Sequence, residues 1–251
     1  MEPGRREGFV LTIRTVAETG STNADLLALV GQVEESFWLR AERQTAGRGR
    51  QGRAWVSPPG NFYGSTLVRL RPSDPAAPGL ALVAGVALFE AVAGILRTTS
   101  LGEGLETALQ LKWPNDLLLG GAKLAGILLE RAGDGVVVGI GVNLVHYPLD
   151  LDRPVTSLVA HASAPTPEAF AETLAERFAH WLARWRGEGL VAISAAWEAR
   201  AHPRGTPLVA ALPDGRRVEG AFAGLDPDGA LILGLADGGR HVIHAGDVFL
   251  I

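Results

Sequence analysis

Hydrophobic residues recur at helical spacing in four stretches of the chain. One of them follows Ser21, where Thr22 and Asp25 have the spacing of a capping box ahead of several leucines. Another carries apolar side chains three or four positions apart from Phe170 to Trp185, which keeps one helix face apolar. The predicted helices follow Ser21, cover residues 79–96, begin near Pro167 and run over residues 190–201.

Short runs of β-branched or large apolar residues, bounded by Gly, Pro, Asn or Asp, predict strands between these helices. Gly120-Gly121 and Gly133-Asp134-Gly135 have turn chemistry and predict hairpins. Consecutive hairpins imply an antiparallel or mixed sheet with helices on one face, and therefore an α+β fold rather than a doubly wound sheet. The predicted strands are residues 37–41, 61–70, 109–113, 117–119, 124–131 and 136–143.

The pattern changes after His202-Pro203. Strand-like runs then alternate with Pro-Asp-Gly and Asp-Gly-Gly turns, which predicts a separate small β-barrel. We therefore expect two domains, residues 1–202 and residues 203–251. The predicted barrel strands are residues 206–212, 217–225, 230–235 and 241–251.

The composition indicates a folded globular protein. The 251 residues are 47% hydrophobic, and a net charge of −4 provides no general basic field for nucleic acid or membranes. The absence of cysteine excludes disulfides and thiolate metal sites and suits a cytoplasmic location. The N-terminus has no apolar signal region. Glu90 interrupts the apolar stretch 79–96, which we interpret as a buried core helix rather than a membrane span.

The glycine-rich sequence GRGRQG at residues 47–52 matches a dinucleotide-binding pattern. That interpretation requires a helix starting at Gly52, but Pro58 and Pro59 follow without helical periodicity. The segment instead predicts a flexible loop that places arginines among glycines, where guanidinium groups can pair with phosphate. A solvated surface loop is the alternative.

Two further clusters favour an anion-binding site. The sequence KWPND at residues 112–116 lies at a strand end, and Lys123 follows in an otherwise apolar strand. A lysine in such a strand is costly to bury unless an anion meets it. The sequence GIGVN at residues 139–143 ends a strand with Asn143, whose amide could read an adenine edge or cap the loop.

Taken together, these motifs resemble those of the biotin protein ligases, also called biotin–[acetyl-CoA-carboxylase] ligases. The resemblance rests on STN at 21–23, QTAGRGRQGR at 44–53 with Trp55, KWPND, KLAGI at 123–127 and GIGVN, in family order. It implies a catalytic domain of the class II aminoacyl-tRNA synthetase/biotin ligase type and an SH3-like C-terminal barrel. Some family members carry an N-terminal DNA-binding domain. The 20 residues before Ser21 are too few for one, so we expect a short form without repressor function.

The resemblance also implies the reaction. Biotin's carboxylate attacks the α-phosphorus of ATP to give biotinyl-5′-AMP, and a lysine of a biotin carboxyl carrier protein then takes the biotinyl group. Mg²⁺ would accompany ATP. The expected partners are biotin, ATP and the carrier, with no nucleic acid and no membrane, and two copies of the chain are expected to pair through the sheet.

Site roles follow from the same resemblance. Lys123, Arg48 and Arg50 are the expected catalytic residues, with Lys123 bridging the biotin carboxylate and the α-phosphate. Asp116 could hold metal, orient the incoming lysine or serve the turn. The expected biotin-binding residues are Ser21, Thr22, Asn23, Gln44, Gly47, Arg48, Gly49, Arg50, Lys123 and Gly126. The expected ATP- and adenylate-binding residues are Arg48, Arg50, Trp55, Asn115, Asp116, Lys123 and Asn143.

Three alternatives stay open at this point. A lipoate or octanoate ligase or transferase would share the fold and accept an aliphatic chain in place of the ureido ring. A nucleic-acid-binding module would use the Arg-Gly loop, but the acidic composition and the few aromatic residues argue against it. A biotin sensor without catalysis is the third.

Overall fold

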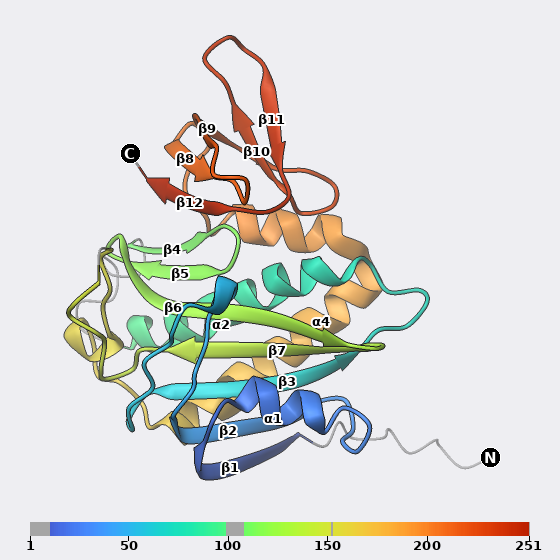
Figure 1. Cartoon of the computed structure of the whole chain (residues 1–251), viewed down its shortest axis with the longest axis vertical. Coiled ribbons are helices and arrows are strands. Elements are labelled where there is room, and N and C mark those ends of the chain that lie inside the picture. The colour runs from blue at the N-terminus through green and yellow to red at the C-terminus, as the bar shows by residue number, and fades with distance from the viewer. Residues whose placement is uncertain (1–10, 99–107, 152, 251) are drawn as a thin grey trace.

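The computed structural model describes residues 11–98, 108–151 and 153–250. Its larger part is a seven-stranded mixed sheet in the order β1-β2-β3-β7-β6-β5-β4, in which only β1 and β2 run parallel (Figure 1). This confirms the α+β class. The strands are β1 (Thr12–Thr19), β2 (Phe37–Gln44), β3 (Phe62–Arg69), β4 (Leu109–Lys112), β5 (Asp116–Leu119), β6 (Ala122–Ala132) and β7 (Gly135–Val142).

Helices cover both faces of this sheet, so the prediction of helices on one face was wrong. The helix α1 (Thr22–Ala28) packs in front of β3 and β7, whereas α2 (Leu80–Arg97) and α4 (Pro167–Glu198) lie behind the sheet (Figure 1). Alternation along β7 shows why: Val136 and Val138 join the large core, while Val137 joins Leu26 of α1 in a small cluster. The hairpin turns in the sequence predicted the sheet, but they did not predict that helices cover both of its faces.

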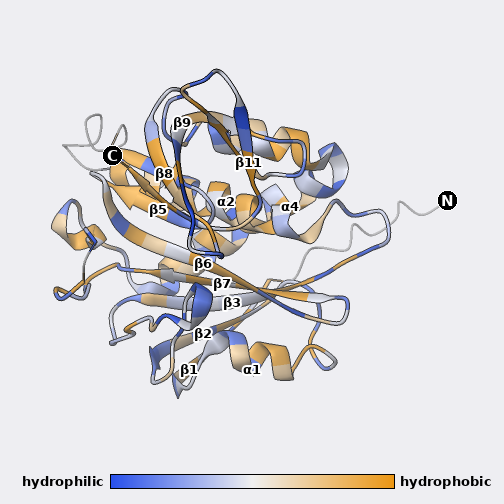
Figure 2. Ribbon diagram, turned by 45° about the horizontal axis from the view of Figure 1, so that its top comes forward, coloured by the Kyte–Doolittle hydropathy of each residue, from blue (hydrophilic) through white to orange (hydrophobic). Residues whose placement is uncertain are grey.

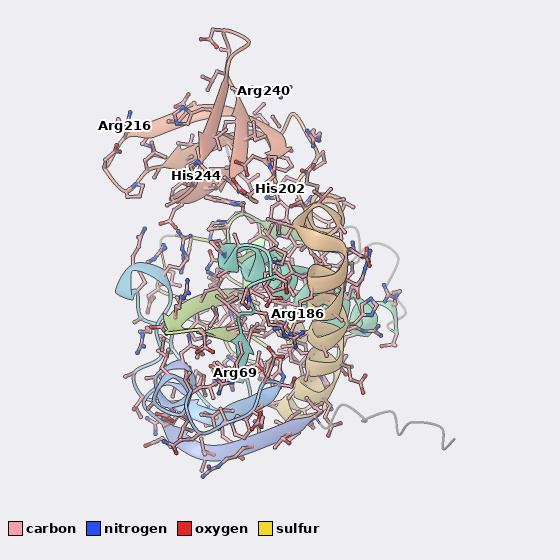
Figure 3. All side chains as sticks on the ribbon, turned by 90° about the vertical axis from the view of Figure 1, so that its right-hand side faces the viewer. Arg69, Arg186, His202, Arg216, Arg240 and His244 are labelled. Atoms are coloured by element: carbon pink, nitrogen blue, oxygen red, sulfur yellow. The ribbon has the colours of Figure 1, made fainter. Side chains whose placement is uncertain are left out.

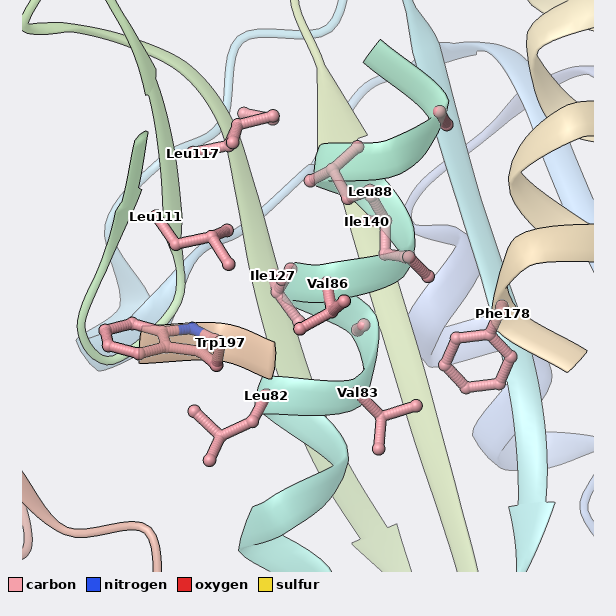
Figure 4. Packing of buried hydrophobic residues seen from close by; sticks show 14 of the residues in the cluster. Leu82, Val83, Val86, Leu88, Leu111, Leu117, Ile127, Ile140, Phe178 and Trp197 are labelled. Atoms are coloured by element: carbon pink, nitrogen blue, oxygen red, sulfur yellow. The ribbon is translucent and has the colours of Figure 1, made fainter. Parts of the chain in front are cut away.

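The large core forms between the sheet and α2, which is hydrophobic along almost its whole length (Figure 2). Figure 4 shows Val83 and Val86 of α2 among Ile127 of β6 and Ile140 of β7. The segment Ala77–Arg97 is long and apolar enough to cross a membrane, yet 72% of its most apolar window is buried inside the protein. The prediction of a buried core helix is therefore confirmed.

Two details differ from the sequence predictions, and a third agrees. β1 was not predicted, because it is an edge strand with mostly exposed, polar side chains. Ser21, not Thr22, caps α1: the Ser21 side chain accepts from the amide of Ala24. The prediction of two helices, one beginning near Pro167 and one near Leu190, is confirmed: they meet in a kink at Gly189, whose φ of 79° is outside the helical region, and together carry the label α4.

The C-terminal part is a five-stranded antiparallel sheet in the order β11-β10-β9-β8-β12, drawn in orange and red in Figure 1. The predicted last strand is two strands, because the chain bends at His244 and Ala245. Leu208 and Phe222 belong to the same hydrophobic cluster as α2. The strands are β8 (Pro207–Ala211), β9 (Arg217–Leu225), β10 (Leu231–Gly234), β11 (Arg240–Ile243) and β12 (Asp247–Leu250).

Candidate active site

A cleft that is open to solvent lies on the α1 side of the sheet. Its walls are the N-terminus of α1, the glycine-rich loop, the ends of β4 to β7, and β12 of the C-terminal sheet. The cleft brings together residues that are far apart in the sequence. Of the expected site residues, Ser21, Thr22, Asn23, Gln44, Arg48, Gly49, Arg50, Trp55, Asn115, Asp116, Lys123 and Gly126 line it.

Glycines on β6 and β7 make room for this cleft. An added Cβ at Gly139 would lie 2.1 Å from Asn23 Oδ1, and one at Gly141 would lie 2.7 Å from the indole of Trp55. Between them, Ile140 points to the other face and is buried in the core. The alternation of glycine with large apolar residues therefore lets Asn23 and Trp55 lie against the backbone of the sheet.

The N-terminus of α1 forms a buried polar wall. Gln44 Oε1 accepts hydrogen bonds from the backbone amide of Thr22 at 2.9 Å and from its hydroxyl at 3.2 Å. Ser65 of β3 lies with its hydroxyl 2.6 Å from Asn23 Oδ1 and 2.8 Å from Thr22 Oγ1. Neutral donors and acceptors of this kind suit an uncharged polar group of a ligand.

A buried charge cluster lies opposite this wall. Asp116 forms ion pairs with Lys123 and, at 3.4 Å, with Lys112. Burial raises the pKa of Asp116, but the two lysines outweigh burial, and the net shift is downward. Burial lowers the pKa of Lys123, and Asp116 offsets this only in part. One carboxylate shared by two lysines leaves positive charge for an anionic ligand.

The arginines of the glycine-rich loop are also paired with carboxylates. Arg48 Nη2 lies 2.9 Å from Glu130 Oε1. Arg53 Nη2 lies 3.0 Å from Asp247 Oδ1, and Arg50 Nη1 lies 3.5 Å from the same oxygen. Arg50 also donates to Asn115 Oδ1 at 3.3 Å. The loop is thus attached to both the large sheet and the C-terminal sheet.

Trp55 covers the floor of the cleft. Its ring lies against Gly126 and Gly141, and the Lys123 ammonium is 5.4 Å from the ring centroid. The indole Nε1 is buried without a hydrogen-bond partner among the residues that the structure describes. The indole thus fills the space that the two glycines leave over the sheet.

Two expected site residues lie outside the cleft lining. Asn143 is buried, and its amide donates to the carbonyl of Thr156 at 3.0 Å, as the loop-capping interpretation requires; the adenine contact stays a prediction. Gly47 faces the other side of the loop, where an added Cβ would lie 2.6 Å from the carbonyl oxygen of Trp55. Gly47 shapes the loop rather than contacting the cleft.

The residues present do not form a metal site. In the described part of the chain no three His, Cys, Asp or Glu residues cluster to hold an ion. Both carboxylate oxygens of Asp116 face lysines, so the expectation that Asp116 could hold metal is not supported. Magnesium would therefore have to be held mainly by the phosphates of a nucleotide.

Sequence reasoning missed several residues of the site. Ser65 and Glu130 support the predicted residues from neighbouring strands, and Arg153 lines the cleft. Asp247 reaches the loop from the C-terminal sheet. No motif marks them, because their partners are distant in sequence. The signal that could have found Glu130 is a charged residue at the end of an apolar strand that begins with Lys123.

Comparison with known proteins gives consistent matches. Residues 16–144 match the model of the biotin/lipoate A/B protein ligase family, and residues 209–251 match the biotin protein ligase C terminal domain. A biotin–[acetyl-CoA-carboxylase] ligase of Paracoccus denitrificans is 42% identical over 245 residues, covering 93% of this chain and 98% of the relative. The ligase of that name from Mycobacterium tuberculosis is 38% identical, covering 93% and 86%.

Solved structures show the same fold. The biotin protein ligase of Aquifex aeolicus in complex with biotin and ATP has a TM-score of 0.83 at 24% identity, covering 96% of this chain and 99% of that one. The Leishmania major enzyme in complex with biotinyl-5-AMP has a TM-score of 0.67 at 27% identity, covering 93% and 99%. The chain belongs to the biotin/lipoate A/B protein ligase family and, within it, to the biotin protein ligases.

Proposed function

We propose that this protein activates biotin with ATP as biotinyl-5′-AMP and transfers the biotinyl group to a lysine of a biotin carboxyl carrier protein. Biotin and ATP are the substrates, and Mg²⁺ enters with the ATP phosphates. The names of the relatives above support this reaction. A cytoplasmic location and pairing of two copies remain part of the proposal.

The observation that carries the proposal is the position of Lys123. Its ammonium lies in the cleft beside Asp116 and under the ring of Trp55. The polar wall formed by Thr22, Asn23 and Gln44 lines the same cleft. One ligand can therefore place a neutral polar head at the wall and an anionic end near the lysine.

The first half-reaction brings two anions together. A carboxylate oxygen of biotin attacks the α-phosphorus of ATP, and the bond from that phosphorus to the pyrophosphate oxygen breaks. Negative charge is concentrated on the phosphoryl oxygens in the transition state. We propose that Lys123 neutralises it, together with Arg48 and Arg50 through the guanidinium donors that Glu130 and Asp247 leave free.

The second half-reaction transfers the acyl group. The neutral ε-amine of the carrier lysine attacks the acyl carbon, the bond to the AMP oxygen breaks, and the amine loses a proton. Asp116 is a poor base for that proton, because its pKa is held down by Lys123 and Lys112. We propose that Asp116 orients Lys123 instead.

Release of pyrophosphate from Mg-ATP by the purified protein tests the proposal. Biotin, lipoate, octanoate and no acid should be compared without carrier, and biotin alone should give release of about one equivalent per site. Adding a biotin carboxyl carrier domain should then give a biotinylated carrier. Release with lipoate or octanoate would identify one of the other ligases, and no release with any acid would contradict ligase activity.

A further inference from the structure

Glu130 connects two parts of the cleft without lining it. It lies on β6, and its carboxylate accepts a hydrogen bond from Asn23 Nδ2 at 2.8 Å through Oε2. Through Oε1 it accepts one from Arg48 Nη2 at 2.9 Å. Asn23 is on the polar wall formed by α1, and Arg48 is on the glycine-rich loop. One side chain thus joins the wall to the loop.

This contact is part of a longer hydrogen-bond chain. From Glu130 the chain runs to Asn23, then through the Ser65 hydroxyl to Thr22. It continues from Thr22 to Gln44, from Gln44 Nε2 to Ser57 Oγ at 3.1 Å, and from Ser57 to the carbonyl of Trp55 at 2.9 Å. Arg48 and Trp55 belong to the same loop, so the chain leaves the loop and returns to it.

The inner members of this hydrogen-bond chain are buried. Asn23 is 4% exposed and Ser65 is fully buried, with a strand on either side. Glu130 and Arg48 are its charged members, and their side chains are 25% and 36% exposed. The charged end is therefore the more exposed part of the chain of hydrogen bonds.

The chemistry at this position requires a carboxylate. Both partners of Glu130 are donors, an amide NH₂ and a guanidinium. A glutamine has one acceptor oxygen and one NH₂, so it can serve Asn23 but must then direct a donor at Arg48. The change Glu130→Gln therefore breaks the loop contact while leaving an acceptor for the wall.

We propose that Glu130 is a positioning residue for the adenylation reaction. It holds the Arg48 guanidinium at the cleft and ties the position of the loop to the residues of the polar wall. Only one Arg48 nitrogen contacts Glu130, so its other donors remain available to an anionic ligand. Glu130 itself does not touch the substrate. The proposal rests on the ligase function proposed above.

The first test follows the loop without any reaction. Trypsin cleaves after arginine, and the glycine-rich loop contains Arg48, Arg50 and Arg53. The experiment is done on the protein without biotin or ATP. Glu130→Gln should increase the rate of loop cleavage by about three- to tenfold, because one of the contacts that restrain the loop is lost. Glu18→Gln, which breaks an exposed Glu–Arg pair of 3.1 Å between β1 and β2, is the matched control and should leave that rate unchanged.

The second test separates positioning from a general structural role. Glu130→Gln should raise the KM for biotin and ATP in pyrophosphate release by about three- to tenfold at an unchanged melting temperature. In an Arg48→Ala background the same change should alter KM less than about twofold, because the contact is already absent. Equal effects in both backgrounds, or an unchanged cleavage rate, would overturn the proposal. If the wild-type protein does not adenylate biotin, the ligase function is contradicted. The contact between Glu130 and the loop is still tested in that case, because the trypsin experiment requires no reaction.

Discussion

At the scale of single residues, the site depends on a small number of buried charges. Asp116 is 8% exposed and lies between two lysines, and Lys123 lies between Asp116 and Trp55. Removing one partner of such a cluster leaves another charge uncompensated, which affects stability as well as chemistry. Variants of Lys123 should therefore be compared with a double variant that also removes the charge of Asp116.

We expect Lys123→Ala to lower the rate of biotin-dependent pyrophosphate release by about 100-fold or more, because it removes the cation that we propose neutralises the phosphoryl oxygens. Binding of biotin, measured by calorimetry, should weaken but stay detectable, since the polar wall is intact. The double variant Lys123→Met with Asp116→Asn should be as inactive and more stable than Lys123→Ala. Full activity of Lys123→Ala would contradict the role given to this residue.

Gly139 offers a test of the cleft floor. In Gly139→Ala the new methyl carbon would lie 2.1 Å from Asn23 Oδ1, so Asn23 has to move and the polar wall with it. We expect the KM for biotin to rise by about tenfold or more, measured in the same assay. Gly31→Ala is the matched control, because an added Cβ there meets nothing within 4 Å. The interpretation fails if both variants behave like the wild type.

The sequence predicted the site residues that lie within motifs, and missed those that support them. Lys123 and Arg48 stand out because charge among apolar residues or glycines requires an explanation. Glu130 carries the weaker signal of a charge at the end of an apolar strand, and its contacts with Asn23 and Arg48 appear only in the fold. At Asn143 the sequence left two interpretations open, because an amide at a strand end can contact a ligand or a backbone carbonyl. The fold shows that this amide donates to the carbonyl of Thr156, and the adenine contact stays a prediction.

At the scale of elements, periodic segments were predicted well and segments with weak pattern were not. α2 and α4 have apolar stripes many residues long, so tertiary contacts and local pattern agree. β1 pairs on one side only and carries exposed side chains, which leaves little hydrophobic alternation to detect. The kink at Gly189 was placed between two predicted helices, at a residue that tolerates positive φ.

An ion-pair cluster holds the α1–β2 connection onto α4. Arg186 of α4 donates to both carboxylate oxygens of Glu35, at 2.7 and 2.9 Å, and to the carbonyl of Arg69 at 2.9 Å. Figure 3 shows Arg69 and Arg186 close together beside α4. Burial raises the pKa of Glu35, but Arg186 and the amide of Arg69 outweigh it, so the pKa lies below its ordinary value of 4.5.

The direction of this shift gives a pH-dependent prediction. A lowered pKa in the folded state contributes stability above pH 4.5, and this contribution is lost as pH falls through the folded-state pKa. Glu35→Gln should lower the free energy of unfolding by about 1–2 kcal/mol at pH 7, with a smaller difference from wild type below pH 4.5, measured by urea denaturation. Glu188→Gln, which alters an exposed pair with Arg184, should have little effect at either pH. A Glu35 effect independent of pH would exclude the charge as its cause.

At the scale of the whole molecule, the two sheets share a core and a site. Trp197 of α4 packs edge-on to Phe222 of β9, with ring centroids 6.4 Å apart. The indole of Trp113 donates to the carbonyl of Gly229 at 3.1 Å, and Lys112 Nζ donates to that of Val248 at 3.1 Å. The sequence predicted the C-terminal barrel from its turns but gave no sign that it reaches the cleft.

Asp247 tests whether that contact matters for function. Its Oδ1 is shared by Arg50 and Arg53, which anchors the glycine-rich loop to β12. Asp247→Asn weakens both ion pairs, so Arg50 is held less firmly at the cleft. We therefore expect the KM for ATP to rise by about two- to fivefold, with kcat little changed. Glu219→Gln, an exposed acid on β9 of the same sheet, is the control for a general change in barrel charge. If Asp247 only competed with ATP for the two arginines, its loss would lower the KM for ATP instead. The direction of the change in KM therefore decides whether the C-terminal sheet positions the loop for ATP binding or holds it away from ATP.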